Sequence, residues 1–228
     1  METKDNILIN LDRVSLMHSD NTTRVLQDIS MEVNTGEKIF IFAQPYMAAV
    51  HLLRICATMY SPTSGKVTVF GKETNELGFR DLLLIKKHIG FLERVSSLIS
   101  NKSLFENVIL GLRYHNNISI DEARIHAHTF LLHFGLLDNI NDRPAWIPLE
   151  KQRMALFCRV LVLTPTLLIL EKPSYGLSRD ELELLMEAIL AYQVKSNCSI
   201  IISDDDADFF ARNYGFSVYE LIDGCLSS

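Results

Sequence analysis

The first part of the chain alternates apolar and polar positions in a way that predicts strands. Positions 7–9 are apolar, and positions 29–33 read Ile-Ser-Met-Glu-Val, with every second residue apolar. A period of two places the apolar side chains on one face of a strand, and the Asp-Asn pair at 20–21 is a turn signal between the two runs. We therefore expect the chain to begin with an antiparallel pair of strands.

A strand that leads into a helix is expected next. Positions 38–43 have the continuous apolar character of a buried strand, and positions 48–59 have the spacing of a helix. This order is the start of a βα unit. The turn cluster at 61–65 and the alternation at 66–70 then predict another strand.

The middle of the chain, from about 81 to 140, reads mostly as helices. Ser103 with Glu106, and Ser119 with Glu122, have the spacing of capping boxes. In a capping box each side chain accepts a hydrogen bond from a backbone N–H that the first helical turn leaves unpaired. We expect this stretch to form a helical lobe.

Beyond the lobe, helices and strands alternate again. The predicted elements are a helix at 151–163, a short buried strand at 167–170, a helix capped by Ser178 and Glu181 that runs to about 195, and strands at 199–203 and 217–222. Strands that alternate with helices predict a parallel sheet covered on both faces. The expected fold class is therefore α/β.

Composition narrows the classes of protein that remain. The chain has 228 residues, 48% of them hydrophobic, and a net charge of −6, which favours a single domain and argues against a nucleic-acid-binding surface. The four cysteines lack a paired spacing, which favours reduced thiols that serve packing in a cytosolic protein. No segment approaches the roughly 20 apolar residues of a membrane span, so we expect no direct membrane insertion.

Several segments, in their order and spacing, resemble the ATP-binding subunits of ABC transporters. These are Gly36-Glu37, Ser61-Pro-Thr-Ser-Gly65, Ile89-Gly90-Phe91, Leu104-Phe-Glu-Asn-Val108, Gln152-Arg153, Leu167-Leu-Ile-Leu170, Pro173 and Gly176-Leu177. The resemblance implies a P-loop NTPase-like ABC ATPase core with an antiparallel β-subdomain and an inserted helical subdomain that docks on a transmembrane permease. It predicts one domain, with residues 1–80 and 145–228 as core and residues 81–144 as helical lobe.

The segment that matches the family's phosphate-binding loop lacks the residues that bind phosphate. A phosphate loop needs glycines, a lysine for the β and γ phosphates, and a hydroxyl for magnesium. The matching stretch here is Ala43, Gln44, Pro45, Tyr46, Met47, Ala48, Ala49 and Val50. Each missing charge-assisted hydrogen bond is worth roughly 1.5–3 kcal/mol, so we expect the affinity for nucleotide to be lost. The apolar part of this stretch is interpreted as a helix buried on the sheet.

The other positions that the resemblance assigns to the nucleotide site also differ from the family. Lys172 stands at the position of the catalytic glutamate, Glu171 at that of the acidic residue ending the buried strand, Arg94 at that of the glutamine that senses magnesium, and Asp204 at that of the switch histidine. The signature loop matches Trp146, Ile147, Pro148, Leu149 and Glu150 and lacks its serine and glycines. A lysine cannot polarise an attacking water as a carboxylate does.

Structural roles are the simpler interpretation for several of these residues. We expect Trp146 to be a packed core aromatic, although an exposed tryptophan could anchor a partner. Lys172 is expected to face solvent or to pair with a carboxylate. The acidic run 204–206 is expected to be a solvated loop with helix-start charge. A metal site is not expected at His126, His128 and His133. The first two are two residues apart on a predicted helix and so point in different directions, and no acidic residue or cysteine completes the set.

These losses predict a pseudo-ATPase, which is not an enzyme and binds neither ATP nor magnesium. The first hypothesis is a subunit that docks on a permease at the cytoplasmic face of a membrane, with Phe91, Arg94, Leu104 and Phe105 as the contact. The alternatives are one half of a heterodimer with a competent ABC ATPase, or a soluble interaction module. Residues 104–113 also resemble the ATPases of lipid-trafficking (Mla-like) permeases, which implies a lipid as the cargo. The family resemblance implies a homodimer, or a heterodimer with another ABC ATPase.

Overall fold

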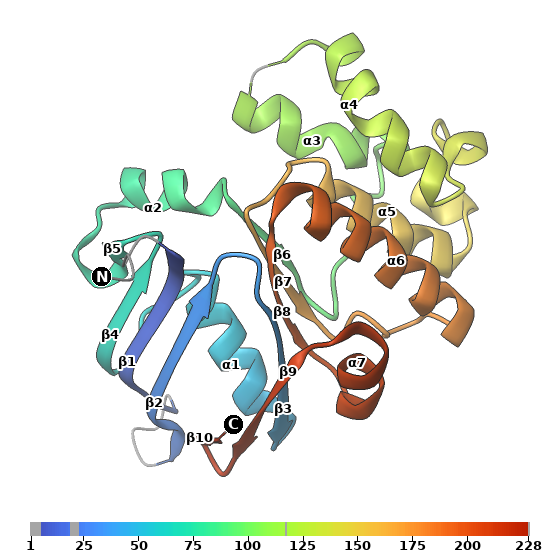
Figure 1. Cartoon of the computed structure of the whole chain (residues 1–228). Coiled ribbons are helices and arrows are strands. Elements are labelled where there is room, and N and C mark those ends of the chain that lie inside the picture. Colours follow the sequence, from blue (N-terminus) through green and yellow to red (C-terminus); the bar gives the residue numbers. More distant parts are fainter. Residues whose placement is uncertain (1–5, 19–22, 117, 228) are drawn as a thin grey trace.

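The computed structural model describes residues 6–18, 23–116 and 118–227, which form two sheets and a set of helices (Figure 1). The first sheet has the strand order β2-β1-β4-β5. Its strands are β1 (Ile7–Met17), β2 (Arg24–Asn34), β4 (Ser64–Val69) and β5 (Lys72–Glu73). β1 pairs antiparallel with β2, as the alternation predicts, and it also pairs antiparallel with β4. The turn expected at 20–21 lies outside the described residues.

The second sheet has six strands in the order β10-β9-β3-β8-β7-β6. They are β3 (Lys38–Gln44), β6 (Ile89–Leu92), β7 (Leu167–Glu171), β8 (Ser199–Ser203), β9 (Ser217–Ile222) and β10 (Cys225–Ser227). β3 pairs parallel with β8 and β9, and β7 pairs parallel with β6 and β8. The predicted parallel sheet is confirmed, and its carboxyl edge gathers the ends of β3, β7 and β8.

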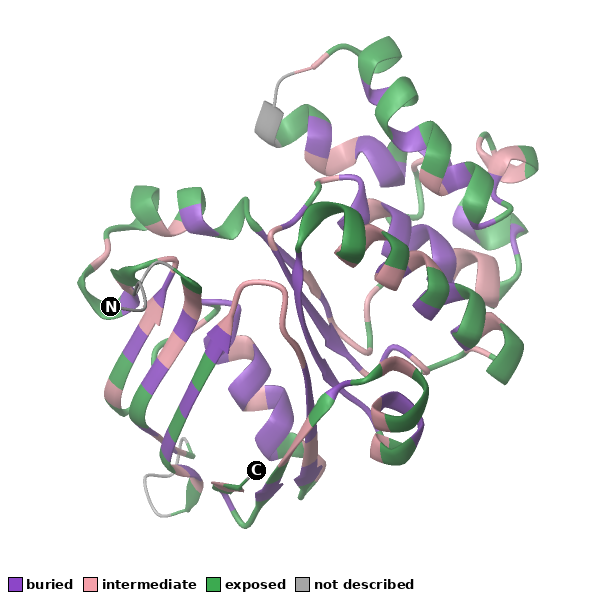
Figure 2. Cartoon of the chain, in the orientation of Figure 1, coloured by how far each residue is buried: buried purple, intermediate pink, exposed green. Residues whose placement is uncertain are grey.

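Successive side chains of the inner strands point to opposite faces of this sheet, and both faces are buried. On one face, Ile39 and Ile41 pack with residues of α1 (Tyr46–Cys56), which lies between the two sheets. On the other face, Phe40 packs with residues of α5 (Leu149–Leu161), α6 (Arg179–Ser196) and α7 (Ala207–Tyr214). Figure 2 shows the buried strands between these helices.

The predicted helical lobe contains α3 (Leu104–Asn116) and α4 (Ile120–His133). Both expected capping boxes are present, with the N–H of Ser103 donating to Glu106 Oε2 at 2.8 Å and the N–H of Ser119 donating to Glu122 Oε2 at 2.8 Å. The range expected for the lobe also includes most of α2 (Phe79–Lys86) and all of β6. β6 belongs to the core sheet, because the buried segment 89–92 pairs with β7.

Element ends and short elements differ from the sequence-based expectations. α1 begins at Tyr46 rather than 48, and α5 begins at Leu149 rather than 151. α7 and β10 were not predicted, although Asp206 caps α7 and Gly215 ends it in a left-handed conformation. Three short 3₁₀ helices, at Thr74–Glu76, Leu137–Asn139 and Pro144–Trp146, connect the longer elements.

Three of the four cysteines have the packing role expected of them, and Cys225 does not. Cys56, Cys158 and Cys198 are buried thiols, and Cys225 is an exposed one. Among the described residues, no helix has the length and apolar character needed to cross a bilayer.

The capping box of α6 gives a stability prediction. Ser178 Oγ accepts from the N–H of Glu181, and Glu181 Oε2 accepts from the N–H of Ser178 at 2.6 Å. The Ser178→Ala variant should lower the free energy of unfolding by about 1 kcal/mol, because one of these bonds is lost. Urea unfolding measures the change, and Ser100→Ala, at an exposed turn serine, is the control. Equal stability of the two variants would contradict the role of the cap.

Candidate nucleotide edge and permease groove

The stretch expected to replace the phosphate loop runs from the end of β3 into the first turns of α1. Pro45 precedes the helix after a cis Gln44–Pro45 peptide bond and provides no side-chain cap. Ala48, Ala49 and Val50 are buried, whereas the side chain of Met47 is largely exposed. Ala49 and Val50, which the resemblance places at the lysine and hydroxyl positions, therefore face the core, as expected for a helix buried on the sheet.

Tyr46 connects α1 to the end of β7. Its hydroxyl donates to Glu171 Oε1 at 3.4 Å. Burial raises the pKa of Tyr46 well above its usual range, and the negative charges of Glu171 and Asp204 add to the shift, while Arg94 opposes it. The phenol therefore stays neutral and can donate a hydrogen bond to the carboxylate.

Lys172 is held by a carboxylate, which is one of the two environments expected for it. Its Nζ lies 2.6 Å from Asp205 Oδ2 and 5.5 Å from the centre of the Tyr46 ring. The lysine side chain is mostly buried, while that of Asp205 is mostly exposed. A positive charge therefore lies at the carboxyl edge, next to the first residue of α1.

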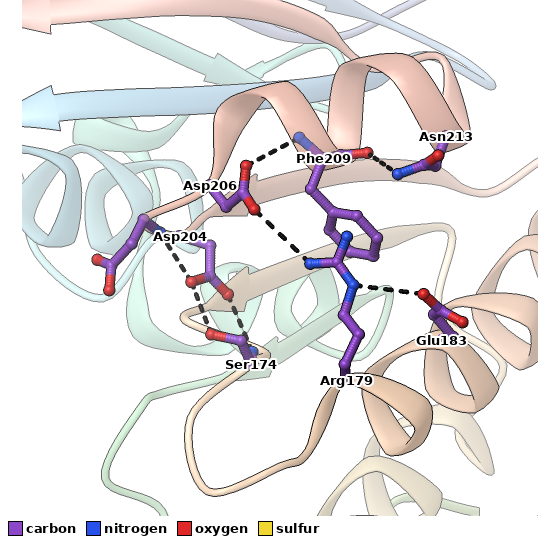
Figure 3. A network of polar contacts seen from close by, with 8 residues as sticks. Ser174, Arg179, Glu183, Asp204, Asp206, Phe209 and Asn213 are labelled. Carbon is purple, nitrogen blue, oxygen red and sulfur yellow. Dashed lines mark hydrogen bonds and ion pairs between the residues drawn. The ribbon is translucent and has the colours of Figure 1, made fainter.

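Within the acidic run 204–206, Asp205 and Asp206 are exposed, as expected of a solvated loop, but that interpretation is wrong for Asp204. Asp204 is 4% exposed, and its carboxylate accepts hydrogen bonds from Ser174 Oγ at 2.7 Å and from the N–H groups of Ser174 and Asp205 (Figure 3). The segment after β7 supplies the two donors of Ser174, which the local sequence does not reveal. Asp206 does have a helix-start role, because it accepts from the N–H of Phe209 at 3.0 Å.

The same network fixes α7 against α6. Arg179, at the first turn of α6, contacts Asp206 at 3.6 Å and Glu183 at 3.3 Å (Figure 3). Its guanidinium also lies 3.3 Å from the centre of the Phe209 ring. The segment between β7 and α6 is thereby attached to the segment that follows β8.

Arg153 is a central residue of the edge that the sequence did not single out as a site residue. It is 5% exposed, and its guanidinium donates to the carbonyl oxygens of Glu93, Arg94 and Lys172 at 3.2–3.3 Å. Burial lowers the pKa of Arg153, while Asp204 and Glu171 oppose that shift. The Gln152-Arg153 pair is visible in the sequence, but the carbonyl partners depend on the fold.

Arg94 also lies at this edge, next to Arg153. Its guanidinium stacks 5.4 Å from the centre of the Tyr175 ring. Arg94 and Tyr175 line a small pocket of about 180 Å³ together with Leu149 and Arg153. Arg94 therefore faces the edge and the start of α5.

The segment that matches the signature loop is largely exposed, which corrects the expectation that Trp146 packs in the core. Trp146 is 72% exposed at the end of a 3₁₀ helix, and Leu149 is also exposed. Ile147 is buried and takes the inward position of this segment. The alternative that an exposed tryptophan contacts a partner is therefore the one that its position allows.

An apolar groove of about 550 Å³ lies between α3, β6 and α5. Its lining includes Met59, Phe91, Leu110, Tyr114 and Leu163. Of the residues expected to contact a permease, Phe91 lines this groove and Arg94 lies beyond it. Leu104 and Phe105 are buried inside the lobe, so a surface contact does not fit them. Their apolar character serves the packing of α3.

The chain has one clear match to a family model and many curated relatives. The sequence model of the ABC transporter family matches residues 26–174. The lipoprotein-releasing system ATP-binding protein LolD of Psychrobacter arcticus is 27% identical over 83% of this chain and 84% of its own length. LolD of Coxiella burnetii is 27% identical over 89% of this chain and 88% of its own length.

Solved structures have the same fold. The dimeric structure of a post-hydrolysis state of the ATP-binding cassette MJ0796 bound to ADP and Pi matches with a TM-score of 0.87 at 21% identity. This match covers 96% of this chain and 97% of that one. The structure of cbiO1 from Clostridium perfringens, part of the ABC transporter complex cbiONQ, matches with a TM-score of 0.84 at 20% identity, over 98% of this chain and 88% of that one.

These matches contradict two expectations: that the chain is not an enzyme, and that it binds neither ATP nor magnesium. The family match includes positions 43–50 and 146–150, and the relatives that align over most of the chain are named ATP-binding proteins. The loss of ATP binding was inferred only from the side chains that the phosphate-loop segment lacks. That inference gave too little weight to the backbone N–H groups and the helix dipole, which attract anions at a helix start whatever the side chains are.

Tyr46 gives a prediction about stability at alkaline pH. An unfolded tyrosine ionises near pH 10, whereas burial keeps folded Tyr46 neutral to higher pH. This stabilising contribution is present below pH 10 and is lost as the pH rises towards the folded pKa. The free energy of unfolding should therefore fall less for the Tyr46→Phe variant than for the wild type between pH 9 and 11, by up to about 1 kcal/mol.

Urea unfolding at the two pH values measures this difference. Tyr114→Phe removes a tyrosine that is 80% exposed and should leave the wild-type dependence unchanged. If Tyr46→Phe and the wild type lost stability equally, the buried phenol would not contribute.

Proposed function

We propose, because this chain belongs to the ABC transporter family, that it is the ATP-binding subunit of a transporter and that its permease docks in the groove between α3, β6 and α5. The groove is the observation on which this proposal rests. Its volume lies within the range of sites that hold a ligand or a short segment of a partner. Its lining is mainly apolar, as in grooves that receive an amphipathic helix.

The groove is lined by residues of both the core and the helical lobe. Phe91 belongs to β6 of the core, Leu110 to α3 of the helical lobe, and Leu163 follows α5. Exposed Met59 and Tyr114 lie at the groove and offer apolar area to a partner. A permease segment seated there would contact the core and the lobe at once.

The nucleotide site in this proposal is the carboxyl edge of the parallel sheet. The segment 43–50 has no basic side chain, and Pro45 has no N–H, so charge for the phosphates comes from elsewhere. Lys172 and Arg94 bring positive charge to the edge, and the start of α1 adds its unpaired N–H groups. Glu171, at the end of β7, supplies the carboxylate oxygens that magnesium prefers. Magnesium neutralises the phosphate charge when it is bound.

Asp204 and Arg153 have supporting roles at this edge. Asp204 fixes the segment that contains Ser174, and Arg153 fixes the backbone at 93–94 and 172. Both hold backbone atoms next to the groups proposed to meet the nucleotide. Their function here is to position Lys172 and Arg94.

The exposed segment Trp146–Glu150 is proposed to face a second subunit. One solved structure with this fold, that of the ATP-binding cassette MJ0796, is a dimer bound to ADP and Pi. The partner is either a second copy of this chain or another ABC ATPase. Either assembly would lie at the cytoplasmic face of a membrane and be held there by the permease.

Lipid-linked cargo is the proposed substrate class. The relatives from Psychrobacter arcticus and Coxiella burnetii are named as parts of lipoprotein-releasing systems. The resemblance of residues 104–113 to lipid-trafficking ATPases supports the same class.

Calorimetric titration with Mg-ATP tests the proposed nucleotide edge. The wild type should bind, and Lys172→Met should weaken the affinity about tenfold, because a charge-assisted contact to phosphate is worth at least about 1.4 kcal/mol. Lys195→Met changes an exposed lysine of α6 that lies away from the edge and should bind as the wild type does. No binding at millimolar Mg-ATP, or equal affinity of the three proteins, would refute this assignment.

Co-purification with the permease tests the groove. Met59→Asp places a charge at the groove, and the captured amount should fall at least tenfold because the charge would have to lose its water on docking. Leu132→Asp makes the same change at an exposed leucine of α4 and is the control. Equal capture of both variants would place the permease elsewhere.

A further inference from the structure

α2 carries apolar residues that the fold does not bury. Its sequence, Phe-Arg-Asp-Leu-Leu-Leu-Ile-Lys, has five apolar residues, and only Ile85 is buried. Phe79 is 76% exposed and Leu84 is 53% exposed, with Leu83 also exposed. Figure 2 shows α2 largely in the colour of exposed residues. A surface helix ordinarily turns its apolar stripe to the core, so this outward stripe indicates a partner.

Basic residues are interleaved with the exposed apolar ones. Arg80, Lys86 and Lys87 are all exposed, and Asp81 is the one exposed carboxylate of the segment 79–87. Residues four positions apart share a face of a helix, so Phe79 lies beside Leu83 and Arg80 beside Leu84. One face of α2 therefore presents apolar and cationic side chains together, in a chain whose net charge is −6.

The face is continuous with the groove proposed for the permease. Lys86, at the end of α2, lines that groove together with Met59 and Tyr114. α2 extends from the groove over the side of the molecule that carries the first sheet (Figure 1). With the permease docked in the groove as proposed above, this surface would lie close to the bilayer in which the permease is embedded.

We propose that the exposed face of α2, formed by Phe79, Arg80, Leu83, Leu84 and Lys87, binds the surface of a bilayer that contains anionic lipids. The apolar side chains enter the boundary between headgroups and acyl chains, and the cations contact the anionic headgroups. A net negative chain is repelled by such a surface, so its attachment needs a local cluster of cations. Arg80 and Lys87 supply these cations beside the exposed apolar side chains of the same face.

This inference goes beyond the proposed function, because it assigns the chain a contact with lipid of its own. A peptide segment of the permease is the competing occupant. Lipid contact predicts binding to protein-free vesicles and dependence on anionic headgroups, whereas a permease contact predicts neither. The two occupants are therefore separated by one experiment with purified components.

Vesicle flotation with the full chain tests the proposal. The wild type should float with vesicles of phosphatidylglycerol and phosphatidylcholine, and at least fivefold less with phosphatidylcholine alone or at high salt. The variant Phe79→Ser, Leu83→Ser, Leu84→Ser should lose at least fivefold of the bound fraction, and so should Arg80→Gln with Lys87→Gln. Circular dichroism and thermal unfolding confirm that each variant is folded.

The control is Ile125→Ser with Val194→Ser, which removes two highly exposed apolar residues from α4 and α6. It should float as the wild type does. A wild type that stays with neither kind of vesicle, or an apolar α2 variant that floats unchanged, would overturn the proposal. If the α2 variant lost permease capture while the wild type ignored vesicles, the face would belong to the permease. Calorimetry with Mg-ATP tests the nucleotide edge, and permease capture by the Met59→Asp variant tests the groove. Failure of either proposal is therefore distinguished from failure of the lipid contact.

Discussion

The packing of α1 between the two sheets is the constraint on which the rest of the structure depends. Ala48 and Ala49 are small and almost completely buried, which lets the helix approach the sheet closely. That close approach fixes Tyr46 at the first turn, opposite Glu171 at the end of β7. Ala48 and Ala49, which the sequence resemblance places in the phosphate loop, thus hold the helix in place through apolar packing.

Two surfaces with different chemistry lie on either side of this frame. The carboxyl edge is polar and charged, and its groups are largely paired with one another, as Lys172 is with Asp205. The groove beside β6 is apolar and open. β6 ends at Leu92, immediately before the backbone that Arg153 binds, so the groove and the edge share one short segment. A displacement of that segment would change the geometry of both surfaces.

The features that the sequence predicted are those that neighbouring residues determine. Capping boxes depend on residues three apart, and the strands 199–203 and 217–222 depend on a short apolar run. The exposure of Trp146 and the burial of Asp204 depend on segments far away along the chain, so local patterns gave the wrong environment for both. α7 had its signals, an aspartate cap and a final glycine, but lacked a long apolar period. The sequence also predicted, one by one, which nucleotide positions are altered, but the loss of ATP binding that was inferred from them is contradicted by the relatives.

The partners of Arg153 bear on how this family member can vary. Its guanidinium binds three main-chain oxygens, and no side chain of Glu93, Arg94 or Lys172 takes part in those bonds. Every amino acid has the same carbonyl group, so these three positions can be replaced without removing an acceptor. The edge therefore keeps its geometry while the chemical groups that it displays are exchanged. Side chains at these three positions can therefore change during evolution while the backbone hydrogen bonds to Arg153 are retained.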